Sequence, residues 1–271
     1  MSFSHIKSFV LPQGTKPSAL TTGLAVFLTF MYILNFFVPV NEDFSLSPES
    51  LFKFQMSRLS LYPLVHLSLP HLLFNLLAML APLNRFEMSH GTVFTGVFLN
   101  MIAVFAAVLY CIVGRFLYPT VSVAGASGWC FSLFGYFSLK ESITHPTYPL
   151  FGSQCHIPTQ YSPLVPLFLI ALLVPGSSFW GHLFGLLVGY AIAYRESWFI
   201  KITPPSWVII KIETFLSKLI AIIPSFVQYY KEEETERHPE GYSSVFGNVH
   251  VLPITNESSV PSTGGRVLGT L

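Results

Sequence analysis

Ser127 is the side chain in this sequence best placed for nucleophilic chemistry. It lies between Gly125 and Gly128 in an uncharged apolar segment, Val121 to Phe137. At a helix start the first backbone N–H groups have no intrahelical partner and favour negative charge, so they would stabilise an oxyanion formed on a serine there. The small residues of this segment, Gly128 and Ser132 among them, are equally typical of a helix that packs closely against a neighbour. Taken alone, the segment favours packing over chemistry.

His182 is the ionisable side chain that could activate Ser127. It is the only ionisable group in the apolar segment Gly176 to Tyr194, and polar groups within membrane segments are costly and often functional. Glycines recur beside it every four residues, at Gly181, Gly185 and Gly189. We expect this face to dock on the small residues of the Ser127 segment and to bring His182 within hydrogen-bond reach of Ser127. The alternative is a buried histidine bonded to a backbone carbonyl.

Neither of these two segments contains an aspartate or a glutamate, so the sequence allows a Ser-His dyad rather than a triad. A third apolar segment carries His71 and Asn75 four residues apart, on one face of a helix. Their N–H groups could donate to an oxyanion, or they could form an interhelical hydrogen bond that only stabilises the bundle. For His66 we expect a structural or loop-bonding role.

The composition predicts that membrane helices position these residues. Of 271 residues, 52% are hydrophobic and only 10% are charged, which is far from the soluble norm. The net charge of +1 argues against a nucleic-acid partner. Cys111, Cys130 and Cys155 show no zinc or disulfide spacing and are interpreted as packing thiols. The fold class is all-α, with six membrane helices predicted near residues 20–40, 62–83, 92–113, 122–139, 161–175 and 177–195.

The lysines and arginines predict that both termini are cytosolic, because more of them then lie on the cytosolic side. We expect residues 1–19 to form a cytosolic segment and residues 20–200 the six-helix domain. The loop 41–61 is too apolar for free solvent and should lie partly in the membrane interface. Residues 201–230 are predicted to form an amphipathic interfacial helix, and 231–271 a disordered cytosolic tail.

Three motifs together resemble the rhomboid family of intramembrane serine proteases. GxSG is present at Gly125 to Gly128, HxxxN at His71 and Asn75, and HxxGxxxG at His182, Gly185 and Gly189, and Arg58 stands where the family has a first-loop arginine. The resemblance implies a six-helix bundle that cleaves transmembrane segments of other membrane proteins without a cofactor or a metal. It implies Ser127 as nucleophile, His182 as base, and His71, Asn75 and the Ser127 N–H as oxyanion donors. Phe131 replaces a frequent tyrosine and should stack on His182.

Two other functions are compatible with a membrane bundle of this kind. One is a rhomboid-like scaffold for membrane-protein quality control that has lost catalysis; the intact Ser127 and His182 argue against it. The other is a small transporter with a histidine proton relay, for which no internal repeat is visible.

The resemblance to secretory-pathway rhomboids of fungi implies a Golgi location. In the tail, Gly265 to Gly269 are similar to the end of a motif that recruits an AAA unfoldase. A disordered segment without a binding role is the favoured interpretation.

Overall fold

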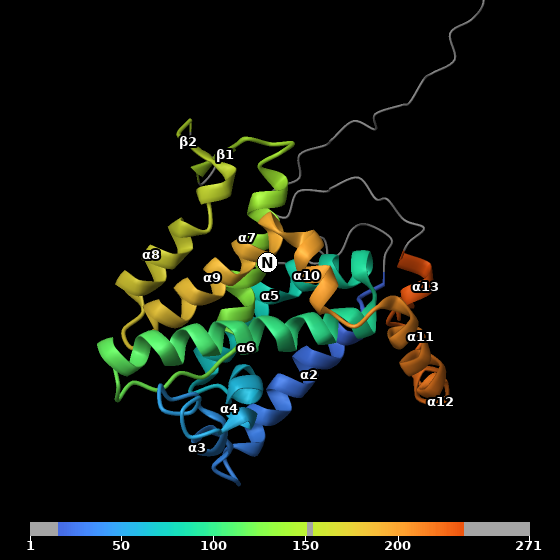
Figure 1. Ribbon diagram of the computed structural model, residues 1–271, viewed down its shortest axis with the longest axis horizontal. Coiled ribbons are helices and arrows are strands. Elements are labelled where there is room, and N and C mark those ends of the chain that lie inside the picture. The colour runs from blue at the N-terminus through green and yellow to red at the C-terminus, as the bar shows by residue number, and fades with distance from the viewer. Residues whose placement is uncertain (1–15, 151–153, 236–271) are drawn as a thin grey trace, which may run out of the picture.

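The computed structural model describes residues 16–150 and 154–235, and within them the chain is mostly helical (Figure 1). The helices in chain order are α2 (Ala19–Leu34), α3 (Val40–Phe44), α4 (Met56–Leu61), α5 (Leu69–His90), α6 (Thr92–Leu117), α7 (Ser127–Glu141), α8 (Leu164–Leu173), α9 (Phe179–Tyr194), α10 (Glu196–Ile202), α11 (Ser206–Phe215), α12 (Ser217–Ile220) and α13 (Glu232–Thr235). The short turns η1 (Tyr62–Leu64) and η3 (Thr159–Tyr161) precede α5 and α8. An antiparallel pair, β1 (Thr147–Pro149) and β2 (His156–Pro158), lies between α7 and α8.

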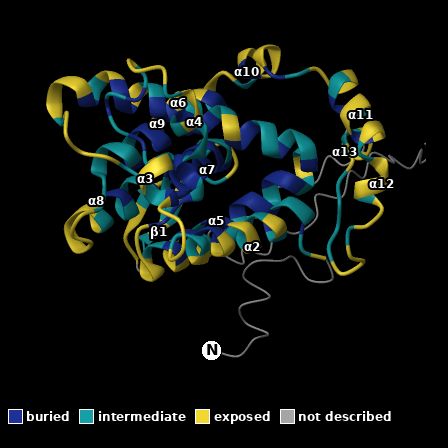
Figure 2. Ribbon diagram, turned by 90° about the horizontal axis from the view of Figure 1, so that it is seen from below, coloured by how far each residue is buried: buried dark blue, intermediate teal, exposed yellow. Residues whose placement is uncertain are grey.

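Helix α7 is the centre of the bundle. It packs most extensively against α9 and also contacts α5 and α6. Every residue from Gly128 to Ser138 except Phe134 is buried, and Figure 2 shows α7 as a buried stretch enclosed by the other helices. A helix that is buried on all sides needs no amphipathic stripe. This explains why small and aromatic residues, rather than alternating polar ones, make up the segment.

The peripheral helices expose apolar faces outward. The exposed side chains include Val26, Phe30 and Ile33 of α2, Leu73, Phe74 and Leu77 of α5, and Phe168, Leu172 and Leu173 of α8. Contiguous apolar surface of this extent is typical of proteins surrounded by lipid. Within the described residues, α6 is the one helix that is by itself long and apolar enough to cross a bilayer, and α4, η1 and α5 pass the same criterion only as a pair bent by 86°.

Helices occur in all six predicted segments, but several boundaries differ from the prediction: α2 ends at Leu34 rather than near residue 40, and α7 begins at Ser127 rather than near residue 122. The second segment was predicted to be helical from residue 62, whereas α5 begins at Leu69 after a sharp bend. Ser68 caps α5 by accepting a hydrogen bond from the His71 N–H at 3.4 Å, and Pro70 occupies its first turn. His66 therefore precedes the helix, although it falls within the segment predicted to be helical. The fifth segment is a ten-residue helix, α8, preceded by Pro163.

The region after α10 also differs from the prediction. Instead of one amphipathic helix up to residue 230, α11 and α12 end at Ile220, and the chain then runs back to the starts of α2 and α6. The Ala19 N–H donates to Gln228 O at 2.8 Å, and the Thr92 N–H donates to Tyr230 O at 2.9 Å. The predicted disorder from residue 231 is wrong for 232–235, which form α13 against α5, α6 and α11.

The first loop is folded against the bundle by specific contacts. Leu46 and Val123 form a two-way backbone bridge, with both N–H···O distances at 2.8 Å. Arg58 Nη1 donates to Ser45 O at 2.7 Å, which ties α4 to the preceding segment. These contacts fix the chain on both sides of the residues that lead into α7.

Candidate active site

Ser127 is the first residue of α7 and is half-buried. The two residues before it are held by backbone hydrogen bonds: the Gly125 N–H donates to Tyr62 O at 2.9 Å, and the Ala126 N–H donates to His66 Nε2 at 3.3 Å. Ser127 is thereby positioned at an open helix start, where its own N–H has no intrahelical acceptor. The expected loop-bonding role of His66 is confirmed.

The side chains of His71 and Asn75 converge on Gly125. A Cβ atom placed on Gly125 would lie 2.7 Å from His71 Nε2 and 3.3 Å from Asn75 Nδ2. Gly125 has φ +113°, a conformation that side-chain-bearing residues rarely adopt, so both the space and the backbone here require glycine. Asn75 is 6% exposed, and its Nδ2 has no hydrogen-bond partner. An oxyanion formed near Gly125, two residues before Ser127, could accept a hydrogen bond from this unpaired buried donor.

The predicted docking of α7 on α9 is confirmed by the closeness of the two backbones. A Cβ on Gly185 would lie 2.5 Å from Gly128 O, and one on Gly189 would lie 2.0 Å from Ser132 O. Ser132 Oγ lies 2.8 Å from Gly185 O, which adds a hydrogen bond across the contact. The close approach that small residues allow therefore brings the two candidate catalytic helices together.

Gly181 is an exception among the three glycines that we expected on this face. Its nearest neighbours are Ser178 and Val123, not residues of α7. Ser178 Oγ accepts from the Gly181 N–H at 3.1 Å and caps α9. Gly181 therefore belongs to the helix start and not to the interhelical contact.

His182 lies in the first turn of α9 and is 5% exposed. Its ring stacks on Phe131 with centroids 4.8 Å apart and an interplanar angle of 24°, so the predicted stacking is confirmed. His182 Nδ1 is buried without a hydrogen-bond partner. The hydrogen bond that we expected between His182 and Ser127 is not formed in the described part of the chain. In substrate-free sites such hydrogen bonds are commonly long and tighten in the complex.

The carboxylates nearest in sequence are held at the other end of the bundle. Glu141, at the end of α7, accepts a hydrogen bond from Arg85 at 2.8 Å. Glu196, after α9, accepts one from Tyr136 Oη at 2.6 Å and another from Lys140. Although burial raises the pKa of Glu196, the hydrogen bonds from Lys140 and Tyr136 prevail and lower it below its ordinary value. Neither carboxylate orients His182, because both are committed elsewhere.

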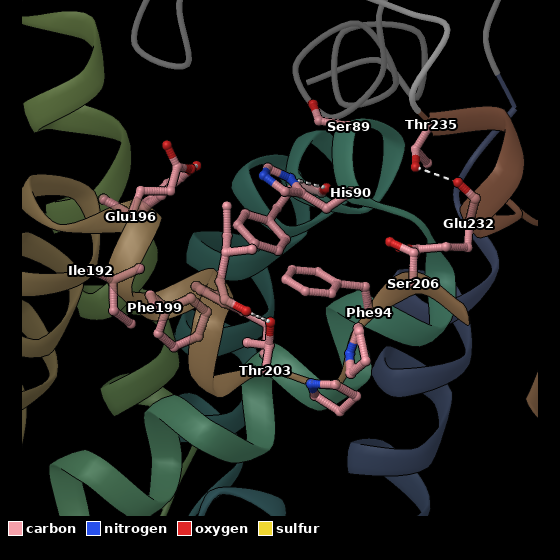
Figure 3. Close-up of a pocket in the computed structure, with 16 residues that line it drawn as sticks. Ser89, His90, Phe94, Ile192, Glu196, Phe199, Thr203, Ser206, Glu232 and Thr235 are labelled. Atoms are coloured by element: carbon pink, nitrogen blue, oxygen red, sulfur yellow. Dashed lines mark hydrogen bonds between the residues drawn. The ribbon is translucent and has the colours of Figure 1, made fainter. Parts of the chain in front are cut away.

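A cavity of about 470 Å³ lies at this same end, where α9 gives way to α10 (Figure 3). Its walls include His90 and Phe94 from the junction of α5 and α6, and Glu196 and Phe199 from α10. It touches α7 through Tyr136, so it is separate from the Ser127 site at the opposite end of that helix.

Sequence reasoning missed two contributions to the site. The Tyr62 carbonyl that accepts from Gly125 left no signal, because a backbone acceptor is independent of side-chain pattern. The hydroxyl of Ser132 was interpreted only as a small residue, whereas it also bonds to Gly185 O. Ser132 lies on the helix face that carries Gly128 and Gly135, and this position could have indicated a contact between its hydroxyl and the neighbouring helix.

Comparison with known proteins agrees with this geometry. Residues 53–199 match the family model described as "Rhomboid domain". The "Rhomboid-type serine protease 2" of Saccharomyces cerevisiae is 59% identical over 264 residues, covering 97% of this chain and 98% of the relative. Proteins with the same description from Kluyveromyces lactis and Candida albicans are 46% and 38% identical, covering 98% and 94% of this chain and 99% and 93% of theirs. On these matches, the chain belongs to the rhomboid family, a family of helical membrane proteins.

Proposed function

We propose that this protein is an intramembrane serine endopeptidase that cleaves transmembrane segments of other membrane proteins with a Ser127–His182 dyad. The observation that carries the proposal is the docking of α9 on α7, which stacks His182 on Phe131, one helical turn after Ser127. The relatives' description as rhomboid-type serine proteases supports the same reaction.

The reaction begins when Ser127 Oγ attacks the scissile carbonyl carbon and its proton passes to His182. With Nδ1 of His182 buried, we assign this proton to Nε2. The Ser127 N–H, His71 Nε2 and Asn75 Nδ2 donate to the oxyanion of the tetrahedral intermediate. The intermediate then collapses, the C–N bond breaks, and His182 gives its proton to the leaving amine.

Water completes the reaction on the acyl-serine. His182 takes a proton from the attacking water as the water oxygen bonds to the acyl carbon. The tetrahedral intermediate then collapses: the ester bond to Ser127 breaks, His182 returns the proton to Ser127 Oγ, and a carboxylic acid leaves. The half-buried start of α7 is the entry for this water. A substrate helix must unwind locally before it is cut, because its intact backbone hydrogen bonds protect the carbonyls from attack.

We further propose that α2, α5, α6, α7, α8 and α9 are six membrane spans with both chain termini in the cytosol. The excess of lysine and arginine on that side supports this orientation. It places the Ser127 end of α7 toward the non-cytosolic side. A Golgi location follows from the resemblance to fungal secretory-pathway rhomboids. The predicted unfoldase motif at Gly265 to Gly269 lies outside the described residues and stays a prediction.

The test is cleavage of single-span membrane proteins co-reconstituted with the purified protein in lipid vesicles. Ser127→Ala and His182→Ala should each abolish product formation while the thermal unfolding midpoint changes little. Ser142→Ala is the matched control, since its hydroxyl donates only to Leu139 O at the far end of the same helix. Cleavage by both active-site variants at the wild-type rate would refute the dyad. A folded wild-type protein that cleaves none of the substrates would favour the non-catalytic scaffold.

A further inference from the structure

The helices that follow α9 carry basic side chains that all face outward. Arg195, Lys201, Lys211 and Lys218 are the bases between Arg195 and Ile220, and all four are exposed. Arg195 lies over the ring of Tyr194 at 5.0 Å, Lys201 over Trp198 at 5.9 Å, and Lys211 over Trp207 at 4.8 Å. The positive groups are thus held beside exposed aromatic rings.

The acidic side chains of the same stretch are buried or paired. Glu196 is bonded to Tyr136 and Lys140, as described above. Glu213 is 8% exposed; it accepts from Tyr229 Oη at 2.9 Å and from the Glu232 N–H at 3.2 Å. Glu213 is therefore buried and Glu196 is paired with Lys140 at 31% side-chain exposure, so the exposed charged residues between Arg195 and Ile222 are all basic.

Large apolar side chains accompany these charges. Trp198 and Trp207 are 67% and 60% exposed, and Phe215, Leu219 and Ile222 are 86%, 63% and 75% exposed. Figure 1 shows α11 and α12 beside the bundle, on the side away from α8. We call this exposed face, from Arg195 to Ile222, the basic–aromatic surface.

The chemistry of this surface selects its partner. Tryptophan and lysine together are typical of the membrane–water interface, where rings lie at the headgroup level and ammonium groups meet phosphates. A second copy of the chain would bring the same positive charges face to face, which disfavours a symmetric dimer here. The surface begins where α9 ends, so it lies at the level at which the bundle leaves the bilayer.

We propose that the basic–aromatic surface binds anionic phospholipid headgroups of the leaflet at this end of the bundle. In the orientation proposed above this is the cytosolic leaflet, the one rich in anionic lipids. Residues 201–222 lie along that leaflet, with Lys201, Lys211 and Lys218 at the phosphates and Phe215, Leu219 and Ile222 among the acyl chains.

Hydrogen–deuterium exchange of the full chain in nanodiscs tests the proposal. One preparation contains phosphatidylcholine alone and the other contains phosphatidylcholine with phosphatidylserine, at equal protein content. Each lysine at an anionic surface corresponds to roughly a fivefold gain in binding. We therefore expect the amides of 206–215 to exchange at least about fivefold more slowly when phosphatidylserine is present, and the effect to vanish in concentrated salt.

Charge variants make the result specific. Lys201→Gln/Lys211→Gln/Lys218→Gln should remove the response to phosphatidylserine, and Lys211→Gln alone should weaken it. Lys53→Gln is the matched control, since Lys53 is an exposed lysine at the other end of the bundle and should leave the response unchanged. The exchange of α7 amides reports folding in every variant.

Three outcomes would overturn the proposal. Exchange over 206–215 could be identical in the two lipid mixtures, which would leave the lysines as topology signals only. The response could persist in the triple variant, which would place the lipid effect elsewhere. Soluble glycerophosphoserine added to phosphatidylcholine nanodiscs could reproduce the slowing, which would identify a free phosphate compound rather than a membrane surface as the ligand. Because the readout is not proteolysis, failure here is distinguishable from failure of the proposed dyad.

Discussion

Adding one methyl group between α7 and α9 should reduce catalysis far more than it reduces stability. In Gly185→Ala the new Cβ would lie 2.5 Å from Gly128 O, and in Gly189→Ala it would lie 2.0 Å from Ser132 O. Both obstacles are backbone atoms, so no side-chain rotation relieves them. Ordinary contact begins at 3.4 Å, and the helices must therefore move apart by about 1 Å.

The expected size of the effect follows from this displacement. A misplacement of about 1 Å between reacting groups can cost roughly 100-fold in rate. Overpacking costs about 1–3 kcal/mol, whereas replacing a helical glycine with alanine returns about 0.5–1 kcal/mol. We therefore expect Gly185→Ala to lower kcat by about 100-fold with a net loss of stability of at most about 2.5 kcal/mol, and Gly189→Ala to be more severe.

Two measurements check this prediction: the cleavage rate in lipid vesicles and the thermal unfolding midpoint. Gly23→Ala is the matched control, because it places the same methyl group in a helix with nothing within 4 Å. It should keep the wild-type rate. The reasoning is refuted if Gly185→Ala cleaves at the wild-type rate, or if Gly23→Ala loses as much activity.

Three further predictions concern Phe131, Glu87 and Glu196. Phe131→Leu keeps the side chain apolar and most of its volume but removes the ring that stacks on His182 at 4.8 Å. We expect kcat to fall about tenfold with KM unchanged, and an equal kcat would show that the stacking is dispensable. Glu87 is 0% exposed and accepts hydrogen bonds from the N–H groups of Leu20 and Thr21 and from the hydroxyls of Thr21 and Thr92. Glu87→Ala leaves these donors unpaired and should lower the free energy of unfolding by at least about 3 kcal/mol. An unchanged denaturation curve would contradict this prediction. Hydrogen bonds hold the pKa of Glu196 below its ordinary 4.5, so the ionised carboxylate stabilises the fold above that pH, and this stabilisation is lost on further acidification. The difference in unfolding midpoint between wild type and Glu196→Gln should therefore be present at pH 7 and shrink below about pH 4.5. A difference that does not vary with pH would refute this prediction.

The parts of the site that depend on side-chain size could be predicted from the sequence. The spacing of Gly185 and Gly189 against Gly128 and Ser132 has a direct steric meaning, since only small residues let two backbones meet. The stacking of Phe131 on His182 follows from the same docking. In these cases the size of the side chain determines how closely the two helices can approach.

Backbone hydrogen bonds and chain reversals could not be predicted in the same way. The carbonyl of Tyr62 accepts from Gly125, and any residue at position 62 would offer that atom. The return of the chain at Gln228 and Tyr230 to α2 and α6 depends on long-range backbone pairing that hydropathy does not report. The start of α5 was predictable, because Ser68 and Pro70 are typical of a helix N-terminus, but the continuous apolar run concealed it.

The most direct test of the central claim is the rate at which a fluorophosphonate probe modifies the purified protein, with the labelled residue identified by peptide mass spectrometry. The account predicts that Ser127 is labelled in the wild type, that labelling is absent in Ser127→Ala, and that it falls at least about 100-fold in His182→Ala. Ser142→Ala should be labelled like the wild type. Labelling of His182→Ala at the wild-type rate, or modification of a serine other than Ser127, would contradict activation of Ser127 by His182.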